Sequence, residues 1–446
     1  MTECTRAEAL FSFGKRNVVA AFDGGRVTSD AGVVLLSELD RKTGVSSRLA
    51  RAVRDGRQDG KVRYRIEDLL RQRILQIACG YEDASDANTL RRDPAFEAAV
   101  NPSGARKELA SQPTLSRLET GANSKDVYRM SEALLEMYID WLRRQGRKGW
   151  NEIVLDVDST DDPTHGSQQL TLFHGFYEQW MYHPLLVFDS RGFPIAAVLR
   201  AGTAPDTVGV LAVVTRVLTR IWEEFPQAKV ILRADGGFAS PEAYQFYEAA
   251  EMGYVIGQGY NSVYQTKAEP YLRKAREEFE KTGQKARIFG EFLHQARGWS
   301  RERRVVVKAE ILADGVRNPR FVISNLPLSP VETYEVYTGR GQMENFIKDL
   351  KNALSADRLS CHRFLANQFR LLLHLSAYVL MFLLRELLAG TALANKQFDT
   401  LRLKVLKLGA RVHTSVRRIW LHLASGYPDQ GLWLYLARRL GQLQPT

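Results

Sequence analysis

The stretch NEIVLDVDST, residues 151–160, supplies the first strand of the predicted fold. Its aliphatic run from Ile153 to Val157 is typical of a buried strand. Two aspartates, Asp156 and Asp158, stand two positions apart near its end, and side chains with this spacing share one face of a strand. The stretch therefore predicts a strand that carries carboxylates at its C-terminal end.

The residues after this strand alternate between strand and helix patterns. A hairpin is predicted from Met181 to Arg200, and a helix is predicted to begin at an Asp206 cap. A buried strand ending in LRADGG, a second helix and the short strand YVIGQGY follow. The order strand, strand, strand, helix, strand, helix, strand predicts a mixed α/β sheet rather than an all-parallel one.

Five regions are expected along the chain. They are a mostly helical region 1–148, the first part of the sheet 149–260, a β-rich insertion 261–330, the last core helix 331–365 and a C-terminal helical region 366–446. The last region is expected to contain a basic hairpin, because Leu401, Leu403 and Val405 alternate with Arg402 and Lys404.

The overall charge favours an anionic partner. The chain has 446 residues and a formal net charge of +11, from 62 Lys and Arg against 51 Asp and Glu. In a large globular chain this excess is typical of proteins that bind nucleic acid. Cys4, Cys79 and Cys361 have no metal-ligand spacing and imply no disulfide framework, which favours a reducing compartment.

One apolar segment could be mistaken for a membrane span. Leu371–Leu384 is almost continuously apolar, but it is shorter than the ~20 residues that a span needs and it contains His374. We predict a buried helix here and no membrane association. The N-terminus, MTECTRAEALFSF, lacks the apolar core of a signal peptide, so we expect a cytoplasmic protein.

Two further carboxylates could join the aspartates of the first strand. Asp235 ends the apolar strand in LRADGG, where an unpaired carboxylate is costly without a partner or a metal. Glu344 lies in YTGRGQMENFIKDLKN, residues 337–352, which predicts an amphipathic helix. At ~100° per residue, four side chains fall within an arc of ~60° on this helix: Tyr337, Arg340, Glu344 and Lys351.

Two aspartates from strands and one glutamate from a helix form a ligand set for two Mg²⁺ ions about 4 Å apart, with Mn²⁺ as a substitute. One ion would activate a water or a 3′-hydroxyl, and the other would stabilise the leaving oxygen. Basic residues beside them would hold phosphates. The structural alternatives are aspartates that cap turns and a solvated charged edge on the helix.

Taken together, these motifs resemble those of the DDE transposases of bacterial insertion sequences. The likeness is greatest to the group with a Tyr-x2-Arg-x3-Glu-x6-Lys signature, which the four side chains above match at every spacing. The resemblance implies an RNase H-like catalytic core with the triad Asp158, Asp235 and Glu344. Asp156 remains an alternative to Asp158 as the first ligand.

The resemblance also implies partners and an activity. We expect a homodimer that binds terminal inverted repeats and target DNA, and that cleaves and transfers DNA strands. Tyr337, Arg340 and Lys351, with Lys348 on the same helix, are expected to contact DNA. An RNase H-like nuclease without transposition and a transposase-derived DNA-binding protein are the alternatives.

Two other segments are candidate DNA contacts. Trp299 stands beside three arginines in GWSRERR and could stack on a base, or it could pack within its own domain. In SQPTLSRLE, residues 111–119, the pattern resembles the second helix of a helix-turn-helix, which would place Ser116 and Arg117 on DNA. An ordinary capped helix is the alternative for this segment.

Overall fold

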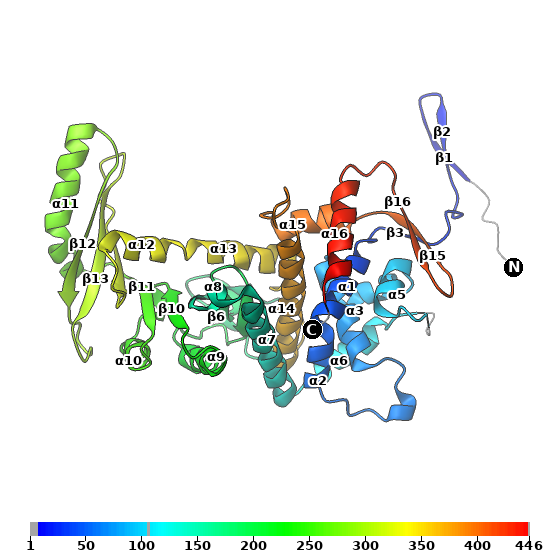
Figure 1. The fold of residues 1–446 in the computed structure, drawn as a ribbon, viewed down its shortest axis with the longest axis horizontal. Helices are drawn as coiled ribbons and strands as arrows, with labels where there is room; N and C mark the ends of the chain where they lie inside the picture. Colours follow the sequence, from blue (N-terminus) through cyan, green and yellow to red (C-terminus); the bar gives the residue numbers. More distant parts are fainter. Residues whose placement is uncertain (1–7, 105–107, 445–446) are drawn as a thin grey trace. The chain divides into compact units, whose positions relative to one another are not determined.

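The computed structural model describes residues 8–104 and 108–444, so Cys4 lies outside the described residues (Figure 1). The chain divides into two compact units. The first comprises the described residues up to Ala122, Ala353–Ser355 and the chain from Ser376 onward, and the second comprises Asn123–Asn352 and Ala356–Leu375. The unit boundaries at Ala122 and Leu375 differ from the expected changes near residues 148 and 365.

An eight-stranded mixed sheet forms the centre of the second unit, in the order β12-β13-β14-β11-β10-β4-β8-β9. The strands are β4 (Glu152–Ser159), β8 (Leu185–Asp189), β9 (Pro194–Val198), β10 (Lys229–Ala234), β11 (Gly253–Gln258), β12 (Ala286–His294), β13 (Arg303–Ile311) and β14 (Arg320–Ser324). Strands β4, β10 and β11 run parallel, and every other neighbouring pair is antiparallel. The predicted mixed α/β sheet is confirmed.

The helices of this unit begin where local chemistry allows. They are α7 (Ser124–Gln145), α8 (Arg147–Trp150), α9 (Val210–Glu224), α10 (Pro241–Ala249), α11 (Ser262–Thr282), α12 (Pro330–Thr338) and α13 (Gly341–Lys348). The predicted Asp206 cap is wrong, because α9 begins four residues later, after Gly209. Gly209 has a φ of 79°, which glycine adopts without strain, and residues Pro205–Val208 form a turn before it.

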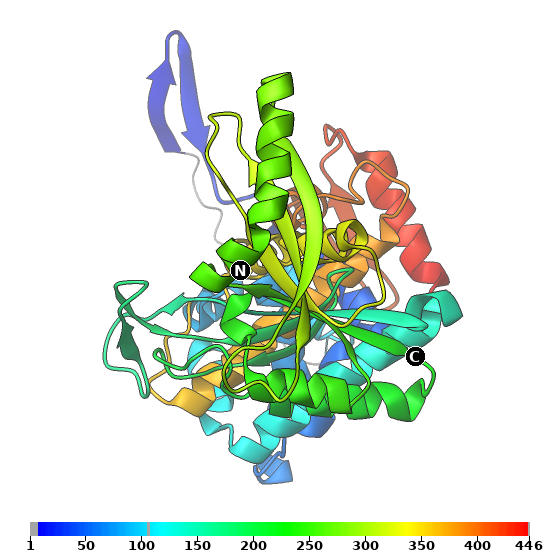
Figure 2. The ribbon, with the colours of Figure 1, turned by 90° about the vertical axis from the view of Figure 1, so that its left-hand side faces the viewer.

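The region expected as a β-rich insertion, residues 261–330, extends the central sheet with β12, β13 and β14. Strand β14 pairs with β11 in the register Val255↔Ser324, and α11 packs against β12 and β13 (Figure 2). One hydrophobic cluster joins side chains of both regions: Ile231, Val255, Val306, Val322, Leu326 and Tyr334. The central strands and the strands of the insertion therefore share one hydrophobic core.

The helix predicted over residues 337–352 is interrupted. Helices α12 and α13 follow one another along a line in Figure 1, but residues 339 and 340 form a tighter turn between them. There, the amide of Arg340 donates to Tyr337 O at 3.0 Å, and the amide of Met343 donates to Arg340 O at 2.8 Å. A π-helical turn, Asp349–Ala353, follows α13. The uniform 100° rotation that placed four side chains in one arc is therefore wrong across this stretch.

The first unit is mostly helical and is built from both ends of the chain. Its helices are α1 (Val33–Thr43), α2 (Val45–Ala52), α3 (Ile66–Ala78), α4 (Ala87–Leu90), α5 (Pro94–Val100), α6 (Gln112–Gly121), α15 (Phe398–Leu401) and α16 (Gln430–Gln442). The hairpin β1 (Glu8–Phe13) and β2 (Arg16–Ala20) precedes them, and β3 (Val27–Thr28) pairs with β15 (Ala410–Thr414), which pairs with β16 (Ile419–Leu423). The amide of Ala31 donates to Leu408 O at 2.9 Å and so joins the two chain ends.

Two expectations for the C-terminal region have different outcomes. Residues 398–406 are helical, so the strand expected from the alternation at Leu401–Val405 is wrong. Leu401 and Val405 are buried while Leu403 is exposed, which is the four-residue spacing of a helix face. The hairpin lies further on, at β15 and β16.

Helix α14 (Phe364–Leu387) contains the apolar segment. Among the described residues it is the one helix whose length and composition would suffice to cross a membrane, and 94% of its most apolar window is buried within the protein. The predicted buried helix is confirmed. The boundary between the two compact units falls inside it, after Leu375.

Candidate active site

Two of the predicted carboxylates meet at one edge of the sheet. Strands β4 and β10 are parallel and pair in the register Asp156↔Arg233, so Asp158 and Asp235 reach the C-terminal edge side by side. Asp235 directly follows β10 and caps a short 3-10 turn by accepting a hydrogen bond from the Gly237 amide at 2.9 Å. Ligands of open α/β sheets bind at this edge.

Arg340 joins the two carboxylates. Its Nη2 atom donates to Asp158 Oδ2 at 2.8 Å and to Asp235 Oδ2 at 3.2 Å. Burial raises the pKa of Asp158 to about 6, the Arg340 charge opposes this rise, and the neighbouring Asp235 charge adds to it. One cationic side chain thus bridges two carboxylates, so a single positive charge faces two acidic groups.

Asp156 has a different environment, although it is two residues away on the same strand. Its side chain is fully buried, and both of its oxygens accept hydrogen bonds from Arg233, each at 2.7 Å. Arg233 also donates from Nη1 to Val336 O at 3.0 Å. A Cβ atom at Gly339 would overlap Arg233 Nη1, so this glycine gives the guanidinium room. The geometry favours Asp158 over Asp156 as a ligand, because Arg233 occupies both oxygens of Asp156.

Glu344, the third predicted carboxylate, is exposed on α13, four residues after Arg340. Its carboxylate makes no hydrogen bond or ion pair with the residues that the structure describes. Within residues 8–104 and 108–444, no three His, Cys, Asp or Glu side chains are grouped closely enough to hold a metal ion. The structure therefore brings together Asp158 and Asp235 and leaves Glu344 apart, and the triad stays a prediction.

The remaining signature side chains point toward the same sheet edge. Tyr337 lies against Gly257 of β11, where a Cβ atom would come within 2.5 Å of the tyrosine hydroxyl. Lys351 Nζ donates to both the carboxylate and the carbonyl oxygen of Asp161, each at 2.8 Å. Lys348 is exposed and makes no ion pair within the described part of the chain. Their contacts with DNA stay predictions.

Trp299 packs within its own region of the protein. Its ring lies 5.5 Å from the ring of Tyr244 and 5.7 Å from that of His294, and the Arg303 guanidinium lies 5.1 Å from its centroid. The neighbouring arginines are ion-paired, Arg301 and Arg303 with Glu248 and Arg304 with Glu291. This geometry supports the packing alternative, and a contact between Trp299 and DNA stays a prediction.

Ser116 and Arg117 lie on α6 in the first unit. Arg117 is exposed, and Ser116 is half-buried. The chain between α5 and α6, residues 101–111, is longer than the three- or four-residue turn of a helix-turn-helix, so the motif is not formed by these two helices. The segment is a helix that begins after Ser111, but the Ser111 side chain accepts no hydrogen bond from the helix amides, so the predicted side-chain cap is not formed.

The sequence did not indicate a second polar group at the site. A Cβ atom at Gly237 would overlap the Asp206 carboxylate and lie 3.1 Å from Asp235 Oδ1, so both carboxylates face this glycine. Arg200 donates to Ser159 Oγ at 2.6 Å and lies 3.9 Å from Asp206. Arg200 ends an apolar stretch of the sequence, as Asp235 does, and this position is the signal in the sequence that could indicate the group.

A small sheet with exposed aromatic side chains follows Asp158 in the chain. It consists of β5 (Asp162–Pro163), β6 (Leu172–His174) and β7 (Gln179–Tyr182). Gln179 donates to Asp161 at 3.2 Å, which links this sheet to the partner of Lys351. Four aromatic side chains of its strands and of the β6–β7 connection are exposed: Phe173, Phe176, Tyr177 and Trp180.

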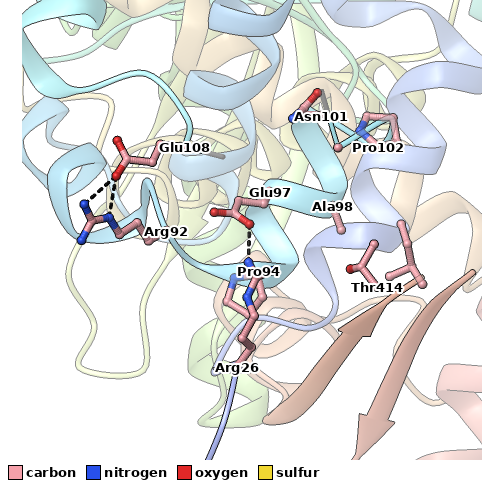
Figure 3. Close-up of a pocket in the computed structure, with 11 residues that line it drawn as sticks. Arg26, Arg92, Pro94, Glu97, Ala98, Asn101, Pro102, Glu108 and Thr414 are labelled. Carbon is pink, nitrogen blue, oxygen red and sulfur yellow. Dashed lines mark hydrogen bonds and ion pairs between the residues drawn. The ribbon is translucent and has the colours of Figure 1, made fainter. Parts of the chain in front are cut away.

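A pocket of about 540 Å³ lies in the first unit (Figure 3). Helix α5, the chain after it and the tip of the β15–β16 hairpin line it, and none of the predicted site residues does. Its charged side chains are paired, Arg26 with Glu97 and Arg92 with Glu108 (Figure 3). The pocket therefore presents no unpaired catalytic group.

Comparison with known families decides the class of protein. Residues 11–445 match the family model described as Transposase DDE domain group 1. The chain belongs to this transposase family. Members are DNA transposases, which act on DNA and use divalent metal ions in general. The resemblance stated from the signature residues is confirmed.

The chain was also compared with solved structures. It resembles the cryo-EM structure of the piggyBac transposase synaptic complex with hairpin DNA, with 11% sequence identity and a TM-score of 0.39. The alignment covers 94% of this chain and 86% of that chain. No curated protein matches the sequence.

The residues at the sheet edge fit a divalent cation. Carboxylate oxygens are the ligands that Mg²⁺ prefers, and Asp158 and Asp235 present them side by side. The cationic Arg340 guanidinium between them shows that a positive charge is accommodated at this point.

Proposed function

We propose that this transposase belongs to an insertion sequence and moves it by a cut-and-paste reaction. The observation that carries the proposal is the bridge from Arg340 to Asp158 and Asp235 at the C-terminal edge of β4 and β10. The strand order β9-β8-β4-β10-β11, antiparallel at first and then parallel, supports an RNase H-like core. The site would cleave the strands at the element's ends and join them to target DNA.

Asp158, Asp235 and Glu344 would hold the metal, as two Mg²⁺ ions with Mn²⁺ as a substitute. Bound there, the ions would supply an activated water or 3′-hydroxyl and would stabilise the leaving oxygen. Arg340 donates to the oxygens that a cation needs, so it has to release at least one carboxylate when a cation binds. Its planar guanidinium then suits a phosphate of the reacting strand.

The side chains near this edge would orient the DNA. Tyr337, Arg340 and Lys351 point toward the edge, and the exposed Lys348 follows Glu344 on α13. We include Trp299, Ser116 and Arg117 as further contacts with the terminal inverted repeats. Two ends have to be held together before joining, which supports a homodimer. We propose that the protein acts on DNA in the cytoplasm.

The test uses a duplex that carries one terminal repeat with flanking DNA, a supercoiled target plasmid and Mg²⁺. The wild-type protein should cut at the repeat boundary and join the cut end to the plasmid. Asp158→Asn and Asp235→Asn should bind the duplex without cutting it. Cutting without joining would instead indicate a nuclease, and binding without cutting by the wild type would indicate a DNA-binding protein.

A further inference from the structure

The β15–β16 hairpin of the first unit has two chemically different faces. Residues directly opposite one another in this antiparallel pair share a face, and successive pairs alternate. One face carries apolar side chains that are buried or half-buried, Ala410, Val412, Leu421 and Leu423, and continues toward the tip with the exposed pair Thr414 and Ile419. This face anchors the hairpin in its unit, next to β3.

The other face is cationic and aromatic. It consists of the exposed pairs Arg411 with His422 and His413 with Trp420. Arg418 lies 5.6 Å from the Trp420 centroid, and the His422 and Trp420 rings are stacked with an interplanar angle of 14°. An exposed ring covered by a guanidinium is suited to contact a sugar, a base or a phosphate.

The arginines of the hairpin carry uncompensated charge. Arg411, Arg417 and Arg418 are exposed and make no ion pair within the described part of the chain, and residues 410–423 contain no acidic residue. Elsewhere in the same unit, arginines such as Arg26, Arg71 and Arg73 are paired with carboxylates. The hairpin therefore presents a local excess of positive charge that no acid of its own neutralises.

We propose that this outer face binds double-stranded DNA. A two-stranded ribbon has the width of the major groove, and arginines along it would reach phosphates on the groove walls. The exposed Val416 and Arg417 form the tip of the ribbon, where a small apolar side chain beside a cation suits a base edge. The proposal rests on the proposed function insofar as the DNA is that of a transposition reaction.

The test compares two double variants with the same loss of charge. Arg411→Ala/Arg418→Ala removes two arginines of the outer face. Arg51→Ala/Arg438→Ala removes two exposed arginines of the same unit that make no ion pair with the described residues. Binding to a duplex is measured over a range of salt concentrations, because each phosphate contact contributes about 0.9 to the slope of log affinity against log salt.

The first double variant should lower the salt slope by about two, and the control should leave it unchanged. An unchanged slope in the first variant, or an equal change in both, would overturn the proposal. Melting temperatures should match the wild type, because all four side chains are exposed. Cleavage by the wild type is measured in parallel, so that failure of the hairpin proposal is distinguished from failure of the proposed function.

Trp420 supplies a second, independent readout. DNA should quench the fluorescence of the wild-type protein, and Trp420→Phe should lose most of the change that comes from this ring. Trp420→Ala should weaken binding by roughly five- to a hundredfold if the ring stacks on the DNA, and Trp420→Phe should recover part of the loss. Quenching that is identical in wild type and Trp420→Phe would mean that the ring does not meet DNA.

Discussion

Asp156 and Asp158 stand two residues apart on β4, and each forms an ion pair with an arginine. The two ion pairs differ in burial and in hydrogen-bond geometry. Asp156 and Arg233 form a closed pair with two hydrogen bonds, and neither side chain is more than 8% exposed. Asp158 accepts a hydrogen bond from a single Arg340 nitrogen, Nη2. The same nitrogen also donates to Asp235, whose side chain is 41% exposed. The same two chemical groups thus give a fixed connection inside the sheet and an exchangeable one at its edge.

The difference indicates what each pair does. Through Val336 O, the inner pair fixes the end of α12 to β4 and β10, and so sets where the following helix begins. The outer pair lies where a cation and a phosphate could each replace one partner. The first pair should therefore matter for stability and the second for reaction. The following predictions test this division.

The largest effect should come from the edge carboxylates. Asp158→Ala, Asp235→Ala and Glu344→Ala should each lower strand cleavage by about a thousandfold or more, because metal assistance contributes several kcal/mol to the transition state. The measurement is single-turnover cleavage of a terminal-repeat duplex, with the melting temperature as the control for folding. Wild-type cleavage by any one variant would remove that residue from the site.

The inner pair should show the opposite behaviour. Asp156→Ala leaves Arg233 buried without a counterion, and breaking a buried pair in this way costs about 3–5 kcal/mol of unfolding free energy. Urea denaturation of wild type and variant measures the loss. An Asp156→Ala protein that keeps wild-type stability but cannot cleave would make Asp156 the first metal ligand in place of Asp158.

The pH dependence of stability should report on the buried Asp158 carboxyl. The pKa of Asp158 is about 6 in the folded protein and near 3.8 in the unfolded chain, so the folded state holds the proton between these values. Stability should therefore fall as pH rises from about 4 to 6, by up to about 3 kcal/mol. Asp158→Asn should lack this component in the absence of divalent cations. Parallel pH profiles for the two proteins would contradict the assignment.

A smaller effect should come from the glycine beside the inner pair. Gly339→Ala places a Cβ against Arg233 Nη1 and should cost about 1–3 kcal/mol of unfolding free energy. Gly341→Ala is the matched control, because a Cβ there meets no atom within 4 Å and alanine favours the helix. Equal stability of the two variants would show that Arg233 has room to move.

The sequence predicted the parts of the site that depend on short stretches. Aliphatic runs ended by Asp158 and Asp235 indicated two strands with carboxylates at their ends, and the structure pairs these strands in parallel, which brings both carboxylates to one edge. The pairing of Asp156 with Arg233 was not predictable in this way, since it depends on the register between strands that are 77 residues apart. Local composition contains no information about that register.

Other differences have equally specific causes. The break at residues 339 and 340 lies beside Arg233, whose guanidinium occupies the space next to Gly339, and a periodicity calculation along one helix does not include such a contact. The segment Leu401–Val405, expected as a strand, is helical. It buries Leu401 and Val405, which are four residues apart, and leaves Leu403 exposed. For Trp299, three nearby arginines suggested an exposed ring, whereas their pairing with Glu248 and Glu291 depends on tertiary contacts.

The pairing of β14 with β11 limits how the gene could be shortened. Removing residues 261–330 would leave β11 as an edge strand with unpaired backbone groups, which promotes aggregation of the truncated product. The deletion would also uncover Val255 and Ile231, which pack under Val306 and Val322. A trimmed transposase, whether produced by evolution or by engineering, therefore has to retain at least β14 or replace it with another strand.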